Sequence, residues 1–332
     1  MNSRHLIALV ALVFLPALSI RLYPVTSESF QHDTIVSQVA AADGVAANAW
    51  DRPDTYENRR FHPPLLSYVI MTNNAVFGGD EYRARLFSII AGALACLVVA
   101  ISIYAILGNG TMSLAGAVFG GWMVGLLPVQ LYVSRTANWD GLYSLLSACT
   151  LLGLCLHFKT PRLRTLVWTG VFAALTLLTC ELGLAMLPAF AAVFLYDLWR
   201  RPPRAVWRDW AIMSLVVMTV LTVLWPAGVL RLDYLRTLRF RLFDSSALES
   251  NRPWYRFYTI LFDQAPAYTI VMVAGAAAWL VLLLWRRFRS GTRLLPLLPF
   301  VLYAVMVVLL STRQRLVYIH HIADLFPPLT VV

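Results

Sequence analysis

The chain has 332 residues, of which 59% are hydrophobic and 13% charged, and its mean hydropathy is +0.68. About a quarter of the residues of a soluble domain are charged, so this composition excludes a soluble globular enzyme. A net charge of +10 would suggest nucleic acid as the partner of a soluble protein. Here the arginines stand between apolar runs, which indicates a membrane and no nucleic acid.

Apolar runs long enough to cross a bilayer recur along the whole chain. In chain order, the predicted spans are Leu6–Ile20, Leu86–Leu107, Leu114–Val133, Leu142–Phe158, Leu166–Thr179, Leu182–Leu198, Trp210–Val229, Ala267–Trp285 and Leu294–Leu310, with Ile322–Val332 opening another. They predict an all-α, polytopic helical bundle that forms a single transmembrane domain over residues 1–332. We expect about nine spans, the start of a tenth, and no soluble C-terminal domain.

The first apolar run has an alternative interpretation. It is short, and Ala17-Leu18-Ser19 resembles a weak processing site, so the run is either a membrane span or a cleaved signal peptide. The sidedness of everything after it is the same in both cases.

Basic residues show which side of the membrane each connection faces. Three short connections are rich in arginine and poor in acid, namely Lys159 to Arg164, Arg200 to Arg208, and Arg286 to Arg293. Counting spans places all three on the side of the N-terminus, and by the positive-inside rule that side is cytoplasmic. The sequence therefore predicts a multi-pass protein of a bacterial inner membrane, with its longer loops on the extracytoplasmic face.

The first of these longer loops, residues 21–85, is rich in acidic residues. It holds eight of the 17 acidic residues of the chain: Glu28, Asp33, Asp43, Asp51, Asp54, Glu57, Asp80 and Glu81. A solvated loop is one interpretation. However, residues 35–40 are amphipathic, and the run that begins at Leu65 follows two prolines, as many helices do. We therefore expect two helices along the outer membrane surface that present carboxylates to a cavity.

Two further polar groups lie on the same side. Asp140 follows the third span, where it is either a helix N-cap or a functional carboxylate, and both roles can coexist. The segment after the seventh span is basic and contains Arg231, Arg236, Arg239, Arg241, Arg252 and Arg256. Outward arginines suit either an anionic ligand such as a phosphate or lipid headgroups.

Carboxylates and arginines around one outward cavity can activate a nucleophile and stabilise a departing phosphate. Nucleotides are scarce outside the cytoplasm, so an activated substrate used there is expected to be attached to a lipid. This chemistry points to sugar transfer from a lipid-linked donor, but composition alone does not separate a transferase from a transporter.

Four segments resemble, in order, the motifs of the GT-C membrane glycosyltransferases, in particular the branch with the lipid A aminoarabinose transferase and the protein mannosyltransferases. The first matching segment runs from Glu28 to Leu86 and includes His62-Pro63-Pro64-Leu65. The others are Ser134-Arg135 through Asp140, Pro253 through Tyr258, and Tyr318 through Pro327-Pro328-Leu329. Ser27 stands where the family has the first acid of an acidic pair, and His62 stands where it has a lysine.

The resemblance implies an inverting displacement with a polyprenyl-phosphate sugar as donor and a lipid, glycan or protein as acceptor. Glu28 or Asp33 would act as the base, and Asp140 would orient the acceptor or share that role. The substrate-binding residues would be Arg59, Arg60, His62, Arg85, Arg135, Arg256 and Tyr318. No cofactor is expected, and a divalent metal is possible but not required.

Two other functions remain open at the level of sequence. A transporter or flippase predicts charges deep inside spans and inverted repeats, whereas the charges of this sequence lie in the connections or near span ends and no inverted repeat is seen. A non-catalytic assembly subunit of the cell envelope is compatible with Ser27 in the place of an acid.

Overall fold

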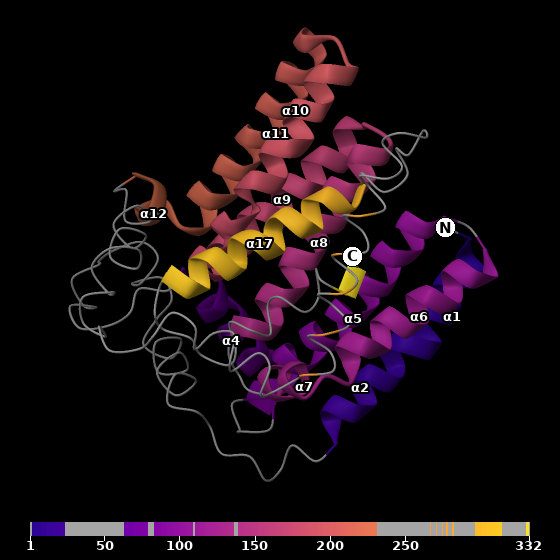
Figure 1. Cartoon of the computed structure of the whole chain (residues 1–332). Coiled ribbons are helices and arrows are strands. Elements are labelled where there is room, and N and C mark those ends of the chain that lie inside the picture. The colour runs from indigo at the N-terminus through magenta and orange to yellow at the C-terminus, as the bar shows by residue number, and fades with distance from the viewer. Residues whose placement is uncertain are drawn as a thin grey trace.

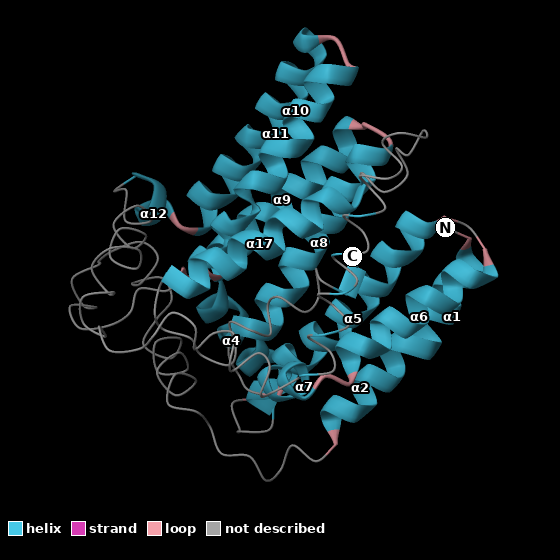
Figure 2. Cartoon of the chain, in the orientation of Figure 1, coloured by secondary structure: helices cyan, strands magenta, loops and turns pink. Residues whose placement is uncertain are grey.

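A computed structural model describes residues 2–23, 63–78, 83–108, 110–135, 139–230, 296–313 and 330–331, together with residues 266, 270, 274, 277 and 281. Every regular element within these ranges is a helix (Figure 2). The elements in chain order are α1 Ser3–Leu9, the π-helical turn η1 Val10–Phe14, α2 Leu15–Leu22, α4 Leu65–Phe77, the 3₁₀ turn η5 Arg83–Arg85, α5 Leu86–Leu107, α6 Thr111–Gly125, α7 Pro128–Ser134, α8 Trp139–Lys159, α9 Leu163–Thr179, the 3₁₀ turn η6 Glu181–Met186, α10 Leu187–Arg200, α11 Pro203–Leu224, α12 Pro226–Leu230 and α17 Leu298–Arg313.

Five helical stretches in the described ranges are long and apolar enough to cross a membrane. They are Ser3–Leu22, Leu86–Leu107, Trp139–Lys159, Leu182–Arg200 and Pro203–Leu224. Shorter apolar helices cover Thr111–Gly125, Leu163–Thr179 and Leu298–Val307, which lie at three other predicted spans. The all-α bundle expected from the sequence is therefore confirmed. The predicted spans Ala267–Trp285 and Ile322–Val332 lie almost wholly outside the described residues.

The third predicted span is wrong as a single helix, because proline interrupts it. α6 ends at Gly125, Leu127 is extended with φ −64° and ψ 123°, and α7 begins at Pro128. The proline ring clashes with a preceding residue in the α region, so a helix commonly ends before it. Proline is then well suited to begin the next helix, because the first turn does not need its missing N–H.

The seventh predicted span, Trp210–Val229, is wrong at both ends for related reasons. α11 begins at Pro203, seven residues before the predicted start, and its first turns carry the charges of Arg204, Arg208 and Asp209. It ends at Leu224, and Pro226 begins the short α12. The apolar pattern found the membrane-spanning part of the helix and missed its polar start.

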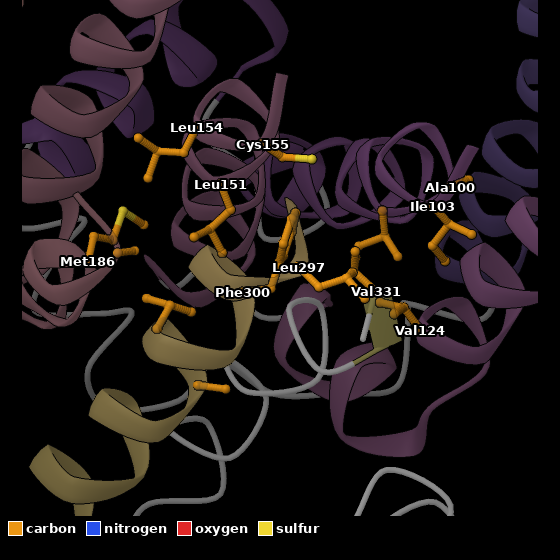
Figure 3. Packing of buried hydrophobic residues seen from close by; sticks show 14 of the residues in the cluster. Ala100, Ile103, Val124, Leu151, Leu154, Cys155, Met186, Leu297, Phe300 and Val331 are labelled. Atoms are coloured by element: carbon orange, nitrogen blue, oxygen red, sulfur yellow. The ribbon is translucent and has the colours of Figure 1, made fainter. Parts of the chain in front are cut away.

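α5 lies at the centre of the bundle and packs against α2, α6 and α8. Small residues such as Ala93, Ala95, Cys96 and Ala100 make its buried surface, which allows close packing between helices. Figure 3 shows how the last described segments complete this core: Leu297 and Phe300 lie beside Leu151, and Val331 lies near Val124.

The contacts divide the connections between helices into two ends. At one end, here called the α4 end, Tyr68 of α4 donates a hydrogen bond to the Leu224 carbonyl at 2.9 Å, and the end of α7 meets the end of α2. At the opposite end, His5 lies 2.6 Å from the Tyr104 hydroxyl, and Lys159 bonds the Ala105 carbonyl. In Figure 1, α4 and α7 lie at the bottom and the connection from α10 to α11 at the top. This is the alternation that counting spans predicts.

The opposite end is held by a buried polar network. The Asp197 carboxylate accepts hydrogen bonds from His157 Nε2 at 2.8 Å and from Trp210 Nε1 at 2.9 Å. Arg201 lies 3.6 Å from the same carboxylate and 2.5 Å from that of Asp209. Each buried carboxylate therefore has a cationic partner, which is the arrangement that burial of charge requires.

Candidate active site

The described part of the candidate site lies where α5 and α8 begin. Asp140 is the second residue of α8 and is 1% exposed, and Arg85 caps α5 and is 2% exposed. A Cβ added to Gly141 would lie 2.7 Å from Ser88 Oγ and 3.0 Å from the Ser88 carbonyl oxygen. The first turns of the two helices are therefore in direct backbone contact, and this contact brings the segments that carry Asp140 and Arg85 to the same place.

Both helices point their amino ends at this place. The N–H groups of a first helical turn lack acceptors within the helix, and the helix dipole gives that end a partial positive charge. Asp140 sits in the first turn of α8, where a carboxylate is favoured. The two helix starts, with Arg85 as the N-cap residue of α5, therefore bring positive charge to this end of the bundle.

One wall of the site is apolar and includes α4. Leu66 and Ile70 of α4 form a buried cluster with Trp139, Tyr143, Cys180 and Leu182. The helix expected from Leu65 onward is thus present, and it packs on the segment that carries Asp140. The helix expected at residues 35–40 lies outside the described residues.

Tyr143 also joins the site to α17. It lies three residues after Asp140 and is fully buried, and its hydroxyl accepts a hydrogen bond from Tyr303 of α17 at 2.9 Å. The Trp139 ring meets the Tyr143 ring edge to face, with 5.9 Å between the centroids. Neither tyrosine was among the predicted site residues, although the three-residue spacing puts Tyr143 and Asp140 on one face of α8.

A pair of arginines joins the end of α2 to the end of α7, at the same end of the bundle. Arg135 Nη2 donates to the carbonyls of Ile20 and Tyr23 at 2.6 and 2.5 Å, and Arg21 Nε donates to Ser134 Oγ at 2.8 Å. Arg21 was not predicted as a site residue. Its place at the end of an apolar run resembles an ordinary boundary charge, so the sequence carries no signal that it is buried.

Three of the ten predicted site residues lie in the described ranges. Asp140, Arg85 and Arg135 are all at the α4 end of the bundle. The remaining seven lie outside the described residues, and their roles stay predictions: Glu28, Asp33, Arg59, Arg60, His62, Arg256 and Tyr318. No group of three or more His, Cys, Asp or Glu side chains that could hold a metal ion occurs among the residues the structure describes.

Comparison with known proteins identifies the family. Residues 61–228, just over half of the chain, match the family described as dolichyl-phosphate-mannose-protein mannosyltransferase. The chain belongs to this mannosyltransferase family. The match begins in the first loop and ends in α12, so it covers Arg85, Arg135 and Asp140. No curated protein matches the chain at a significant level.

Solved structures show the same fold. The mannosyltransferase-family chain is similar to ArnT from Cupriavidus metallidurans bound to undecaprenyl phosphate, with a TM-score of 0.63 and 18% identity, over 98% of this chain and 58% of that one. The apo structure of the same protein gives the same score and identity, over 97% of this chain and 58% of that one. The chain therefore spans less than two thirds of the length of ArnT. Its fold is of the GT-C type, and it is an integral, multi-pass membrane protein.

Proposed function

We propose that this protein is a membrane glycosyltransferase that moves a sugar from a polyprenyl-phosphate donor to an acceptor hydroxyl. The observation that carries the proposal is the position of Asp140, a buried carboxylate in the first turn of α8, next to Gly141, which packs against Ser88 in the first turn of α5; the buried Arg85 is the N-cap residue of that helix. The proposal treats residues 1–332 as a single transmembrane domain.

The donor class is supported by the two comparisons. The family is named for a dolichyl-phosphate sugar, and the structurally similar ArnT is bound to undecaprenyl phosphate. Both lipids, dolichyl phosphate and undecaprenyl phosphate, are long prenyl chains with a single phosphate at one end. An apolar bundle with a polar site at one end suits such a donor, because the prenyl chain of the donor can remain in lipid while its phosphate reaches the site.

The reaction is a single displacement at the anomeric carbon. The acceptor oxygen forms the new glycosidic bond as the bond from that carbon to the phosphate oxygen breaks, which inverts the anomeric configuration. The hydroxyl proton passes to a carboxylate, either Glu28 or Asp33, while Asp140 orients the acceptor or shares the role of base. The products are the glycoside and the polyprenyl phosphate. Proton transfer of this kind typically contributes about 100- to 10,000-fold to a rate.

The departing phosphate gains negative charge, and the site offers positive charge to meet it. Arg85 and the amino ends of α5 and α8 are at hand among the described residues. Arg59, Arg60, His62 and Arg256 are further candidates from the sequence. Fixed donors in a dry site are typically worth about 3 to 4 kcal/mol of barrier each. The donor is a phosphodiester and its leaving group is a phosphate monoester, not a diphosphate, so the proposed reaction does not require a metal ion.

The site faces the extracytoplasmic side in this proposal. The connections after α8 and α10 are rich in basic residues and lie at the opposite end of the bundle, where they include Lys159, Arg164, Arg200 and Arg204. Basic connections remain in the cytoplasm of bacteria, so the α4 end lies outside.

The test is a transfer assay on the full chain in lipid nanodiscs with undecaprenyl-phosphate sugars as donors, measured as released undecaprenyl phosphate. We expect Asp140→Asn to lower the rate by about 100-fold or more, because the side chain keeps its size and loses its charge. Asp140→Glu should retain part of the rate. The matched control is Asp197→Asn at the opposite end, which should leave the rate of the folded protein unchanged.

Two results would overturn the proposal. One is an Asp140→Asn variant that turns over like the wild type. The other is movement of the lipid across the bilayer without release of its sugar, which identifies a flippase. Glu28→Gln and Asp33→Asn, assayed side by side, decide which of the two is the base.

A further inference from the structure

Two arginines join the end of α2 to the end of α7. Arg21, the penultimate residue of α2, donates from Nε to Ser134 Oγ and from Nη1 to the Gly125 carbonyl at 3.4 Å. In the other direction, Arg135 reaches back from the end of α7 to the carbonyls of Ile20 and Tyr23. We call these two arginines and Ser134 the arginine clamp.

The clamp is built into the core of the protein. Arg21 is 0% exposed, and a Cβ on Gly92 of α5 would lie 3.0 Å from Arg21 Nε and 2.5 Å from Ser134 Cβ. The clamp fits only because α5 has a glycine at this point. Four helices, α2, α5, α6 and α7, therefore meet around the Arg21 guanidinium.

Among the residues the structure describes, no acid pairs with Arg21. In the described ranges it bonds one hydroxyl and the carbonyls of Ala17 and Gly125 and interacts with the Cys96 thiol, and its Nη2 has no acceptor there. Burial of a cation without a carboxylate is costly, and a neutral side chain of similar size would fill the same space more cheaply. Stability alone therefore does not account for an arginine here.

Arg135 acts on the end of a helix. The last carbonyls of a helix have no partner within it, and that end carries a partial negative charge. One Arg135 nitrogen donates to Ile20 in the last turn of α2 and to Tyr23, the residue that follows the helix. The guanidinium therefore fixes both the end of α2 and the direction in which the chain leaves it.

The two sides of the clamp are the starting points of the two segments that carry the candidate acids. Glu28 follows Tyr23 by five residues, and Asp140 follows Arg135 by five residues. We infer that the arginine clamp is a positioning device, which sets the separation of the two acid-bearing segments before the reaction. This inference rests on the proposed function, and it gives Arg21 and Arg135 a positioning role in place of contact with the donor.

The test uses Arg135→Ala, Arg135→Lys and Ser134→Ala in the full chain. In the clamp-breaking variants Arg135→Ala and Ser134→Ala, we expect kcat to fall by about tenfold or more, since small displacements of reacting groups cost that much. The Kd for undecaprenyl phosphate should stay within about threefold, because the donor does not touch the clamp. Arg135→Lys should recover part of kcat, since an ammonium can still donate to both carbonyls.

A structural loss elsewhere provides the control. Asp197→Asn breaks a buried network of similar size at the opposite end, so it should lower Tm at least as much as Arg135→Ala while kcat of the folded enzyme stays the same. A loss of kcat in Asp197→Asn equal to that in Arg135→Ala would overturn the inference. A Kd raised about tenfold in Arg135→Ala with kcat unchanged would also overturn it, because Arg135 would then bind the donor itself.

A second measurement does not depend on activity. The amide of Tyr23 is bonded to the Ser19 carbonyl, and its exchange with deuterium reports whether the last turn of α2 is closed. We expect this exchange to accelerate in Arg135→Ala and not in Asp197→Asn. If the wild type transfers no sugar but exchange is faster in Arg135→Ala and unchanged in Asp197→Asn, the proposed reaction is wrong and the arginine clamp is supported. If exchange is unchanged in Arg135→Ala, the clamp is wrong.

Discussion

At the scale of single residues, buried charge is treated differently at the two ends of the bundle. The carboxylates of Asp197 and Asp209 are paired with Arg201, and Asp197 also accepts a hydrogen bond from the Trp210 indole, so both have a structural role. Asp140 and Arg85 are equally buried, but they stand at the starts of two helices that touch through backbone. The positions of these two residues depend on the contact between α5 and α8.

This dependence can be tested at Gly141. A methyl group there would lie 2.7 Å from Ser88 Oγ and 3.0 Å from the Ser88 carbonyl oxygen, and the backbone atom cannot rotate away. We expect Gly141→Ala to destabilise the protein by about 1 to 3 kcal/mol, the usual effect of overpacking. It should also slow transfer about tenfold, because it shifts Asp140 relative to α5.

The matched control is Gly110→Ala, where the new methyl group would meet only Ser113 Oγ at 3.9 Å. Because Gly110 is the N-cap residue of α6, where alanine is less favourable than glycine, it should cost no more than about 1 kcal/mol, and the rate of transfer should not change. Thermal unfolding in detergent and the transfer assay measure both variants. A Gly141→Ala protein as stable and active as the control would show that the close contact is not required.

At the scale of elements, the sequence predicts helices well and their interruptions poorly. The predicted span Leu86–Leu107 has the bounds of α5, and α9 ends at the predicted Thr179. Hydropathy could not show the break before Pro128, because the residues on both sides of it are apolar. Nor could it place the start of α11, whose first turns are charged.

The site was predictable to the extent that its residues are polar and lie next to spans. Asp140 and Arg85 stand out at the mouths of apolar runs, and the structure brings their helices together. The Tyr143 to Tyr303 bond joins residues 160 positions apart, so no local pattern could have indicated it. The same holds for Arg21 and Ser134, which come together from two different helices.

The bond between Tyr143 and Tyr303 is a polar link between α8 and α17, and it permits a direct test. Both rings are fully buried, so removal of either hydroxyl leaves the other without this partner. We expect Tyr143→Phe and Tyr303→Phe each to cost about 1 kcal/mol. The double variant should cost less than their sum, with a coupling of about 0.5 to 1.5 kcal/mol.

The measurement is a double-mutant cycle on unfolding of the full chain. Tyr196→Phe removes the same hydroxyl from a ring that stacks on Phe158 with 3.9 Å between centroids, and it should change stability by less than about 0.5 kcal/mol. Strict additivity of the two substitutions in α8 and α17 would mean that the hydrogen bond does not couple these helices.

At the scale of the whole molecule, the two ends of the bundle differ in chemistry. The α4 end gathers Asp140, Arg85 and the arginine clamp, and the acid-rich first loop leads into it. The opposite end carries the basic connections after α8 and α10. In the proposed orientation, with the basic end in the cytoplasm, a donor made in the cytoplasm has to cross the bilayer before its sugar is transferred, and the acceptor is met outside.

This orientation is open to a labelling experiment with one matched pair of substitutions. Thr72 of α4 and Thr160 after α8 are both exposed, and they lie at opposite ends of the bundle. In right-side-out vesicles we expect a membrane-impermeant maleimide to label Thr72→Cys and to leave Thr160→Cys unlabelled, because arginine-rich connections stay in the cytoplasm. In inside-out vesicles the pattern should reverse. The wild-type chain, whose four cysteines lie in or beside helices and are mostly buried, gives the background labelling. Labelling of Thr160→Cys alone in right-side-out vesicles would invert the molecule. It would place the site in the cytoplasm, where nucleotide sugars are available as donors. The location of the site would then no longer favour a lipid-linked donor.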